Sequence, residues 1–274
     1  MKSSPVVLIT GASSGIGEQT AFTLGEAGYR LVLAARRIER LEEITAQIRQ
    51  AGGDAIAVQL DLSQPDQISN LVMAAQDHYG QIDILVNNAG SARHLWFDEQ
   101  SLEGDIQHLL QVNLVGMIQL TRLVLPGMLE KERGQIIHVS SVAAWVGVPT
   151  YTIYNTGKFG ARGFWASLRR ELRGTGVVVS EIFPGAVDTE FAVNPEVKWK
   201  TSTVTPAFAL VSSRAVARRI LKLIQRRNRK AVFPWFMWLV ILVDAHFPWL
   251  VNWVLSFYFY SRDGIRYAWQ QRSD

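Results

Sequence analysis

Tyr154 and Lys158 stand four residues apart, a spacing that places two side chains on the same face of a helix. A tyrosine near its ordinary pKa of about 10 is a poor proton shuttle at neutral pH. A lysine one turn along favours the phenolate electrostatically, which brings the phenol closer to the working range of general acid–base catalysis. Ser141 and, further back, Asn113 precede this pair. The spacing alone is weak evidence, because many helices place a tyrosine and a lysine four residues apart.

A glycine-rich turn lies near the start of the chain. Residues 6–9 form a mostly β-branched apolar run, typical of a strand buried in a parallel sheet. Residues 10–17 follow as Thr-Gly-Ala-Ser-Ser-Gly-Ile-Gly, and residues 18–26 read as a helix. Glycines let the backbone approach a pyrophosphate, and a helix N-terminus offers free N–H groups. The order strand, turn, helix therefore predicts a dinucleotide site rather than an ordinary tight turn.

With both segments in view, the chain resembles the short-chain dehydrogenase/reductase family over roughly its first 230 residues. Several motifs occur in the family's order. After the glycine turn come Asp61-Leu62, matching the pair that packs near adenine, and Asn87-Asn88-Ala89-Gly90, matching the N-N-A-G signature. Pro184-Gly185, with Val187 and Thr189, resembles the segment that holds the nicotinamide carboxamide.

The resemblance implies a catalytic tetrad of Asn113, Ser141, Tyr154 and Lys158. Tyr154 would protonate the substrate oxygen as hydride reaches the carbonyl carbon. Lys158 would lower the pKa of the tyrosine and bond the nicotinamide ribose. Ser141 would polarise the carbonyl as a fixed donor. Asn113 would hold a helix kink and a water that connects Lys158 to solvent.

The expected cofactor-binding residues come from the glycine turn, the ends of the following strands and the tetrad. They are Gly11, Ser13, Ser14, Gly15, Ile16, Gly17, Arg36, Arg37, Asp61, Leu62, Asn88, Ala89, Gly90, Tyr154, Lys158, Pro184, Gly185, Val187 and Thr189. We expect no metal site, because no cluster of His and Cys has metal-ligand spacing. The chain has no cysteine, which excludes disulfides and a thiol nucleophile.

The second expected strand, near residues 30–35, ends in Arg36 and Arg37. A carboxylate at this place would bond the ribose hydroxyls of NAD and repel a 2′-phosphate. Two guanidinium groups instead suit a phosphate, since arginine offers planar paired donors, and Ser13 could add a hydroxyl. We expect NADP(H) to be favoured over NAD(H), unless both arginines are only solvated surface charges.

Short apolar runs alternate with amphipathic helical stretches along the first 230 residues. Strands are expected near residues 6–10, 30–35, 55–60, 82–86, 135–139 and 177–182. The alternation predicts an α/β fold, a Rossmann-type doubly wound parallel sheet flanked by helices, with ligands beyond the carboxyl ends of the strands. We expect residues 1–230 to form this catalytic domain and residues 231–274 a separate hydrophobic segment.

Residues 214–230 hold eight Lys and Arg and no acid, with Val216, Ile220, Leu223 and Ile224 at helical spacing. Two apolar runs follow, residues 231–243 and 249–260, separated by Asp244-Ala245-His246-Phe247-Pro248. Neither run reaches the roughly 20 residues of a spanning helix. Five of the nine tryptophans lie beyond residue 230, and such density beside basic residues is typical of a membrane interface.

We therefore expect an apolar helical hairpin that dips into one leaflet, with peripheral membrane contact through residues 214–260. The alternatives are a hydrophobic lid or a dimer contact. The Trp- and Phe-rich tail favours lipid over nucleic acid. The first strand follows residues 1–4 at once, so we expect no signal peptide and a cytoplasmic location at the inner face of the membrane.

The leading functional hypothesis is an NADPH-dependent reductase of a lipophilic ketone or aldehyde. Residues 193–205 would form the substrate loop, lined by Trp145, Phe191 and Trp199. The alternatives are a soluble 3-ketoacyl-thioester reductase, a polyol or sugar dehydrogenase, and a non-catalytic nucleotide-binding scaffold at the membrane. The resemblance further implies a homodimer or homotetramer paired through the helix that carries Tyr154 and Lys158.

Overall fold

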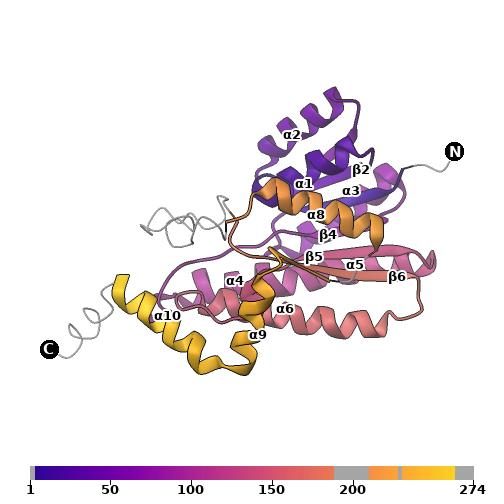
Figure 1. The fold of residues 1–274 in the computed structure, drawn as a ribbon. Helices are drawn as coiled ribbons and strands as arrows, with labels where there is room; N and C mark the ends of the chain where they lie inside the picture. Colours follow the sequence, from indigo (N-terminus) through magenta and orange to yellow (C-terminus); the bar gives the residue numbers. More distant parts are fainter. Residues whose placement is uncertain (1–3, 188–209, 228–229, 263–274) are drawn as a thin grey trace.

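Seven parallel strands form one sheet, in the order β3-β2-β1-β4-β5-β6-β7 (Figure 1). The computed structural model describes residues 4–187, 210–227 and 230–262. The strands are β1 Val6–Thr10, β2 Arg30–Ala35, β3 Asp54–Gln59, β4 Ile84–Asn87, β5 Gly134–Val139, β6 Val177–Pro184 and β7 Lys230–Phe233.

Helices cover both faces of this sheet. One face packs against α1 (Gly15–Glu26), α2 (Ile38–Gln50) and α8 (Ser213–Arg226). The other packs against α3 (Pro65–Tyr79), α5 (Gly116–Glu130) and α6 (Thr152–Glu171). The expected doubly wound α/β fold is therefore confirmed.

Alternate residues of each strand enter the two cores. In β1, Val7 and Ile9 face α1 and α8, whereas Leu8 faces the opposite core; all three are fully buried. Burial on both sides explains why the strands read as continuous apolar runs rather than as alternating ones. After β3 the chain crosses to β4 on the other side of β1. Such a reversal of strand order is where open α/β sheets bind ligands.

The helical stretch between β4 and β5 is irregular. It runs through η2 (Leu102–Gln107), α4 (His108–Leu110) and η3 (Gln111–Val115) before α5. Both η2 and η3 have π-helical hydrogen bonding. Single π-helical turns frequently mark functional sites.

β7 was not among the expected strands. It pairs in parallel with β6, with Lys230 beside Glu181 and Phe233 beside Pro184. The sheet thus continues past residue 230, where the sequence suggested a boundary. The strand has only four residues, and Pro234 with a turn over residues 235–236 separates it from α9.

Two C-terminal helices, α9 (Met237–His246) and α10 (Pro248–Arg262), form the expected apolar hairpin, with a bend of 112° at their junction. In Figure 1 they lie beside the end of α6, away from α1 and α2. Three consecutive residues show how α9 is oriented. Ile241 is 4% exposed and packs against the domain, Leu242 is 50% exposed, and Val243 lines the main cavity.

Ile241 should hold the hairpin against the domain, because it packs in one cluster with Phe183 and Val232 of the sheet. An asparagine there would place a polar group in an apolar contact, at a cost of about 1–3 kcal/mol. We expect Ile241→Asn to accelerate limited proteolysis within the hairpin. Leu242→Asn, one residue along on the exposed side, should leave the cleavage rate unchanged. Equal cleavage of the two variants would contradict this packing.

Candidate functional site

One cavity of about 1170 Å³ lies at the carboxyl ends of the strands and extends to the hairpin. It exceeds the 300–1,000 Å³ of most small-molecule pockets, so it has room for a cofactor and a substrate together. Most of the expected site residues line it: Gly11, Ser13, Ser14, Gly15, Ile16, Arg36, Arg37, Asp61, Leu62, Asn88, Ala89, Gly90, Ser141, Tyr154, Lys158, Pro184, Gly185 and Val187. Gly17 and Asn113 lie behind the wall, and Thr189 lies outside the described residues.

The glycine turn is packed too closely for side chains. Gly11 has a φ of +66°, and a Cβ on it would lie 2.8 Å from the Cα of Ala89. A Cβ on Gly17 would lie 2.1 Å from the carbonyl oxygen of Gly11. Ser14, in extended conformation, is the N-cap residue of α1, whose first N–H groups have no partner within the helix. These features fit a dinucleotide pyrophosphate against the helix N-terminus.

Thr10 connects the glycine turn after β1 with the loop after β4 through hydrogen bonds. Its Oγ1 accepts hydrogen bonds from the backbone N–H groups of Asn88 and Ala89, each at 3.0 Å. In return, Nδ2 of Asn88 donates to the carbonyl oxygens of Thr10 at 2.9 Å and Gly11 at 3.2 Å. The side chain of Asn88 is therefore a brace for the glycine turn as well as a residue of the cavity wall.

Arg36 and Arg37 form a basic rim where β2 ends. Nε of Arg37 donates to Oγ of Ser13 at 3.3 Å, and its Nη2 donates to the Ser13 carbonyl oxygen at 3.2 Å. Burial raises the pKa of nearby Asp61, but hydrogen bonds from Ser63 and the charge of Arg36 outweigh it, so the pKa of Asp61 is lowered. The carboxylate at this end of the cavity therefore stays ionised.

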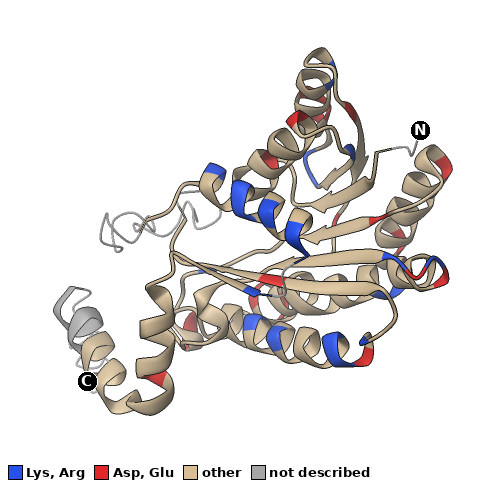
Figure 2. Cartoon of the chain, turned by 45° about the vertical axis from the view of Figure 1, so that its right-hand side comes forward, with Lys and Arg blue, Asp and Glu red and all other residues tan. Residues whose placement is uncertain are grey.

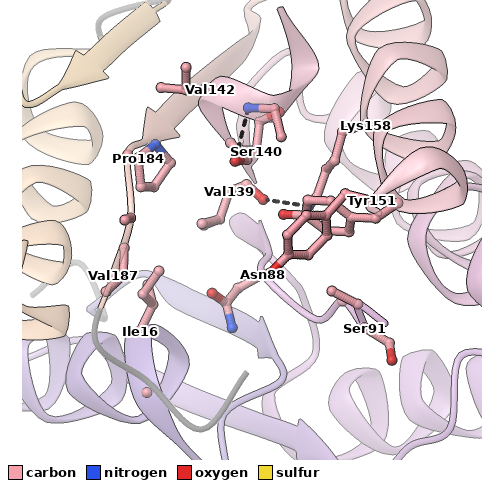
Figure 3. A pocket seen from close by; sticks show the side chains of 18 of the residues that line it. Ile16, Asn88, Ser91, Val139, Ser140, Val142, Tyr151, Lys158, Pro184 and Val187 are labelled. Carbon is pink, nitrogen blue, oxygen red and sulfur yellow. Dashed lines mark hydrogen bonds between the residues drawn. The ribbon is translucent and has the colours of Figure 1, made fainter. Parts of the chain in front are cut away.

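Tyr154 and Lys158 lie on α6, with the lysine Nζ 5.6 Å from the centre of the tyrosine ring. Nζ of Lys158 donates to the carbonyl oxygen of Val139 at 3.4 Å. The side chains of Ser141 and Tyr154 are hydrogen-bonded. Figure 3 shows Tyr151 and Lys158 on one side of the cavity, with Pro184 and Val187 across from them.

The loop that carries Ser141 is clamped to α6. Oγ of Ser141 accepts from the N–H of Ala143 at 3.1 Å and so caps η4 (Val142–Ala144). One turn from the lysine, Nδ2 of Asn155 donates to the carbonyl oxygens of Ala143 at 3.1 Å and Val146 at 2.9 Å. These bonds fix the distance between the serine hydroxyl and the tyrosine.

Asn113 lies in η3 and does not reach the cavity. Its Oδ1 accepts from the N–H of Ser91 at 2.9 Å, and its Nδ2 donates to the Ser91 carbonyl oxygen at 2.7 Å. A Cβ on Gly157 would lie 3.1 Å from the Cβ of Asn113, so this residue also packs against α6. Asn113 thus joins the helix kink, the loop after β4 and the helix of the tyrosine.

Burial dominates the titration of the central pair. It raises the pKa of Tyr154, with the Ser141 hydrogen bond acting in the opposite direction and Tyr151 adding to the rise. Burial also lowers the pKa of Lys158 to about 8. In the protein without a bound cofactor, burial sets the direction of the tyrosine pKa shift, and the lowering of this pKa by Lys158 stays a prediction.

The hairpin contributes a large apolar part of the cavity wall. This part consists of Met237, Leu239, Val240 and Val243 of α9 and of Leu250, Val251, Val254 and Leu255 of α10. The polar residues of the cavity wall that sequence reasoning missed are Ser91, His94, His108, Ser140 and Tyr151. Nδ1 of His94 lies 2.7 Å from Oγ1 of Thr150, and the rings of His94 and Tyr151 are in edge contact with centres 4.5 Å apart.

Trp145 does not line the cavity, contrary to the expectation. Its ring packs between Phe183 and Trp238, with ring centres 5.7 and 5.9 Å away, and the Arg162 guanidinium covers it at 4.0 Å. Apolar neighbours from β6 and α9 draw the ring away from the cavity. The expected substrate loop, with Phe191 and Trp199, lies outside the described residues.

The lowered pKa of Lys158 implies that its buried ammonium group destabilises the folded state. Below about pH 8 the buried ammonium destabilises the folded state by about 3 kcal/mol, and this cost fades as pH rises toward the ordinary value of 10.5. We expect Lys158→Met to raise the free energy of unfolding in urea at about pH 7, with a smaller gain at about pH 10. The control Lys222→Met, at an exposed position of α8, should show no such difference between the two pH values. A destabilised Lys158→Met protein at neutral pH would contradict the account.

The sequence matches known proteins over most of its length. The model of the short chain dehydrogenase family matches residues 5–198. The ketoacyl reductase HetN of Nostoc sp. is 35% identical over 228 residues, which are 82% of this chain and 77% of that protein. The 11-beta-hydroxysteroid dehydrogenase 1A of Arabidopsis thaliana is 32% identical over 261 residues, 90% of this chain and 73% of the relative.

Solved structures share the fold. A short chain dehydrogenase/reductase from Burkholderia phymatum in complex with NAD has a TM-score of 0.81 at 25% identity, covering 90% of this chain and 95% of its own. A single-residue variant of the actinorhodin polyketide ketoreductase with NADPH has a TM-score of 0.77 at 31% identity, covering 85% and 96%. With the glycine turn, the strand order and the family match in agreement, this chain belongs to the short-chain dehydrogenase/reductase family of nicotinamide-dependent oxidoreductases.

Proposed function

We propose that this oxidoreductase reduces the carbonyl group of a lipophilic substrate with NADPH, using Tyr154 as the general acid. The observation that carries the proposal is the composition of the cavity. At one end lie the glycine turn and two arginines, and at the other lies the aliphatic wall of the hairpin. Tyr154 and Ser141 stand between them, hydrogen-bonded to each other. A carbonyl at their hydroxyl groups would have its apolar body against the hairpin.

Each residue of the tetrad has a distinct part in this proposal. When bound, the nicotinamide supplies the hydride. Tyr154 donates its proton to the substrate oxygen, and Ser141 holds that oxygen by a hydrogen bond while negative charge develops. Lys158, buried beside the tyrosine, favours the phenolate left behind. Asn113 holds the helix kink in place through Ser91.

Two arginines favour NADPH over NADH. Both Arg36 and Arg37 line the cavity at the end of β2, where the ribose of a dinucleotide lies in this fold. Arg37 also holds Ser13, whose hydroxyl is a further donor for a phosphate. The polyketide ketoreductase neighbour contains NADPH, whereas the Burkholderia phymatum neighbour contains NAD. The preference of this chain therefore depends on its own two arginines.

The double variant Arg36→Ala/Arg37→Ala tests the cofactor preference. Loss of both guanidinium groups should lower kcat/KM for NADPH by about a hundredfold, because bidentate phosphate contacts disappear, and should leave kcat/KM for NADH nearly unchanged. Arg40→Ala is the control, since Arg40 pairs with Glu18 and Glu43 outside the cavity. An equal loss with both cofactors would sink the assignment.

The apolar wall of the hairpin supports the proposed lipophilic substrate. An extended apolar substrate should gain affinity with each added methylene, by about 0.8 kcal/mol per CH₂ buried. In a series of methyl ketones, kcat/KM should therefore rise with chain length. Val243→Asn, which places an amide on the wall, should flatten this rise, whereas Leu242→Asn on the exposed side should not. A series without dependence on chain length would refute a lipophilic substrate.

A second candidate is the reduction of a 3-oxoacyl thioester. It is favoured by the names of two similar proteins, the ketoacyl reductase HetN and the polyketide ketoreductase. An acyl chain could lie on the same apolar wall. Measuring kcat/KM for a 3-oxoacyl thioester and for the methyl ketone of equal chain length distinguishes the candidates. Only a thioester reductase should have the higher kcat/KM with the thioester.

The proposed function includes membrane association at the cytoplasmic face, and the outer side of the hairpin supports the membrane contact. Among the side chains described in this part of the chain, the most exposed apolar ones are Trp235, just before α9, and Trp249 and Trp253 of α10, at 73, 68 and 66% exposure. Figure 2 shows almost no charge on the described part of the hairpin, whereas basic residues gather on α6 and α8. Residues 237–246 and 248–256 are apolar enough to count together as a broken span, but the 112° bend favours a hairpin lying in one leaflet.

A second stretch, Leu102–Glu130, is also long and apolar enough to cross a membrane. It contains α5, which packs in the core of the domain.

Flotation with anionic vesicles tests this association. The wild type should rise with the vesicles, and Trp249→Ser/Trp253→Ser should lose most of the binding because interfacial aromatic side chains are removed. Met73→Ser is the matched control, since Met73 is 52% exposed on α3, far from the hairpin (Figure 1). Wild-type protein that stays at the bottom of the gradient would disprove membrane contact. Pairing of two chains through α6 stays a prediction from the family resemblance.

A further inference from the structure

Two cations, Arg162 of α6 and Lys230 of β7, lie against the same indole ring. The guanidinium carbon of Arg162 is 4.0 Å from the centre of the Trp145 ring, and Nζ of Lys230 is 5.5 Å from it. The guanidinium carbon is also 5.2 Å from the centre of the Phe159 ring. Such cation–π contacts hold a positive charge in place but do not neutralise it. A helix, an edge strand and the loop after β5 thus bring two positive charges to one place.

Neither cation is neutralised by a carboxylate. Among the described residues, no hydrogen bond or ion pair involves the side chain of Arg162 or of Lys230. The carboxylate that acts on both from a distance is Glu181. Glu181 is fully buried and is already ion-paired with Arg169, which lies two turns beyond Arg162 on the same side of α6. Three cations therefore act on one carboxylate, and two of the positive charges have no counter-ion in the described part of the chain.

The cations of this cluster repel one another. Desolvation lowers the pKa of Lys230, and the attraction of Glu181 opposes this shift. The charges of Arg169, Arg162 and Arg170 lower the same pKa further. Like charges held close together disfavour the charged forms, and an anion bound among them would remove this repulsion. The excess of positive charge, together with the shared ring, is therefore suited to an anionic ligand.

The cluster lies where the hairpin leaves the sheet. Lys230 is exposed at the start of β7, the strand that precedes α9. The Trp145 ring, which carries both cations, packs against Trp238 of α9 with ring centres 5.9 Å apart. Trp238 is 38% exposed, and Trp235 is 73% exposed just before the helix. Figure 2 shows basic residues on α6 and almost no charge on the described part of the hairpin. Tryptophan beside arginine and lysine at the end of an apolar segment is typical of the headgroup level of a bilayer.

We infer that Arg162 and Lys230 bind the phosphate of an anionic phospholipid whose acyl chains lie along the outer side of the hairpin. The inference rests on the membrane contact proposed above and names the headgroup that this contact selects. Arg162 offers a planar fork for two phosphate oxygens, and the flexible chain of Lys230 lets its ammonium close on the same group. A terminal phosphate, as in phosphatidic acid, suits two cations best, because a choline headgroup adds a positive charge of its own. Basic pockets beside apolar helices bind lipid headgroups in this way.

Vesicle binding by two double variants tests this site. The wild type should bind phosphatidylcholine vesicles that contain phosphatidic acid more tightly than vesicles of phosphatidylcholine alone. Arg162→Gln/Lys230→Gln should lose this gain, by about fivefold for each charge removed, and should bind pure phosphatidylcholine as the wild type does. The control Arg218→Gln/Lys222→Gln removes two exposed charges from α8 on the opposite face of the sheet, and it should keep most of the gain. An equal or larger loss in the control would overturn the site, because it indicates attraction by the net charge alone.

Acetylation of lysines tests the site in the wild type, without a substitution. Lys230 is exposed, so acetic anhydride should modify it in the free protein. Dissolved dihexanoyl phosphatidic acid should protect Lys230 and should leave the exposed Lys222 of α8 reactive. Protection to the same degree by inorganic phosphate at equal concentration would show a site for free phosphate and reject the lipid. Unchanged acetylation of Lys230 in the presence of the lipid would reject the site itself.

Failure of the membrane contact and failure of the site give different results. Wild-type protein that binds neither kind of vesicle rejects the proposed membrane contact, and protection of Lys230 by the dissolved lipid then still decides the site. Unfolding in urea checks that both double variants fold, and the loss of two repelling charges should not lower the midpoint of Arg162→Gln/Lys230→Gln. If that variant does not fold, protection of the wild type decides the question.

Discussion

Burial of the Lys158 ammonium beside Tyr154 is the constraint on which the rest of the site depends. A buried charge destabilises the folded chain, and here it lowers the pKa of the lysine to about 8. The surroundings hold it in place through the Val139 carbonyl and through the clamp from Asn155 to the Ser141 loop. Apolar burial on both faces of a seven-stranded sheet offsets the cost. The lysine is then ready to exchange a proton close to neutral pH.

The hairpin packs against the other side of the loop that carries Ser141. Trp145, at the end of η4, packs against Trp238 of α9 and Phe183 of β6. One short turn therefore contacts the serine, the helix of the tyrosine and the apolar wall. Because α9 presents one face to the domain, one to the cavity and one to solvent, a single helix links the reacting centre with the outer surface. A lipophilic substrate and a lipid surface would use two sides of the same element.

The sequence could predict what depends on neighbours along the chain. Val6–Thr10 reads as a buried strand, the glycines at 11 and 17 mark a close backbone approach, and four-residue spacing puts Tyr154 and Lys158 on one helix face. It could not predict cross-strand neighbours, because a slip of one residue in register reverses every side chain. His138 and Glu181, 43 positions apart, became neighbours only with the observed register. β7 was missed because four residues beside a long apolar tail carry no strand signal of their own.

The central claim is that Tyr154 delivers the proton to the substrate carbonyl. The most direct test is NADPH oxidation by Tyr154→Phe with a long-chain ketone that the wild type reduces, together with the dissociation constant for NADPH. The variant should lose at least about a hundredfold in kcat, since a general acid contributes that much, while its affinity for NADPH should stay within a few-fold of the wild type. A Tyr154→Phe enzyme with nearly wild-type turnover would contradict the account.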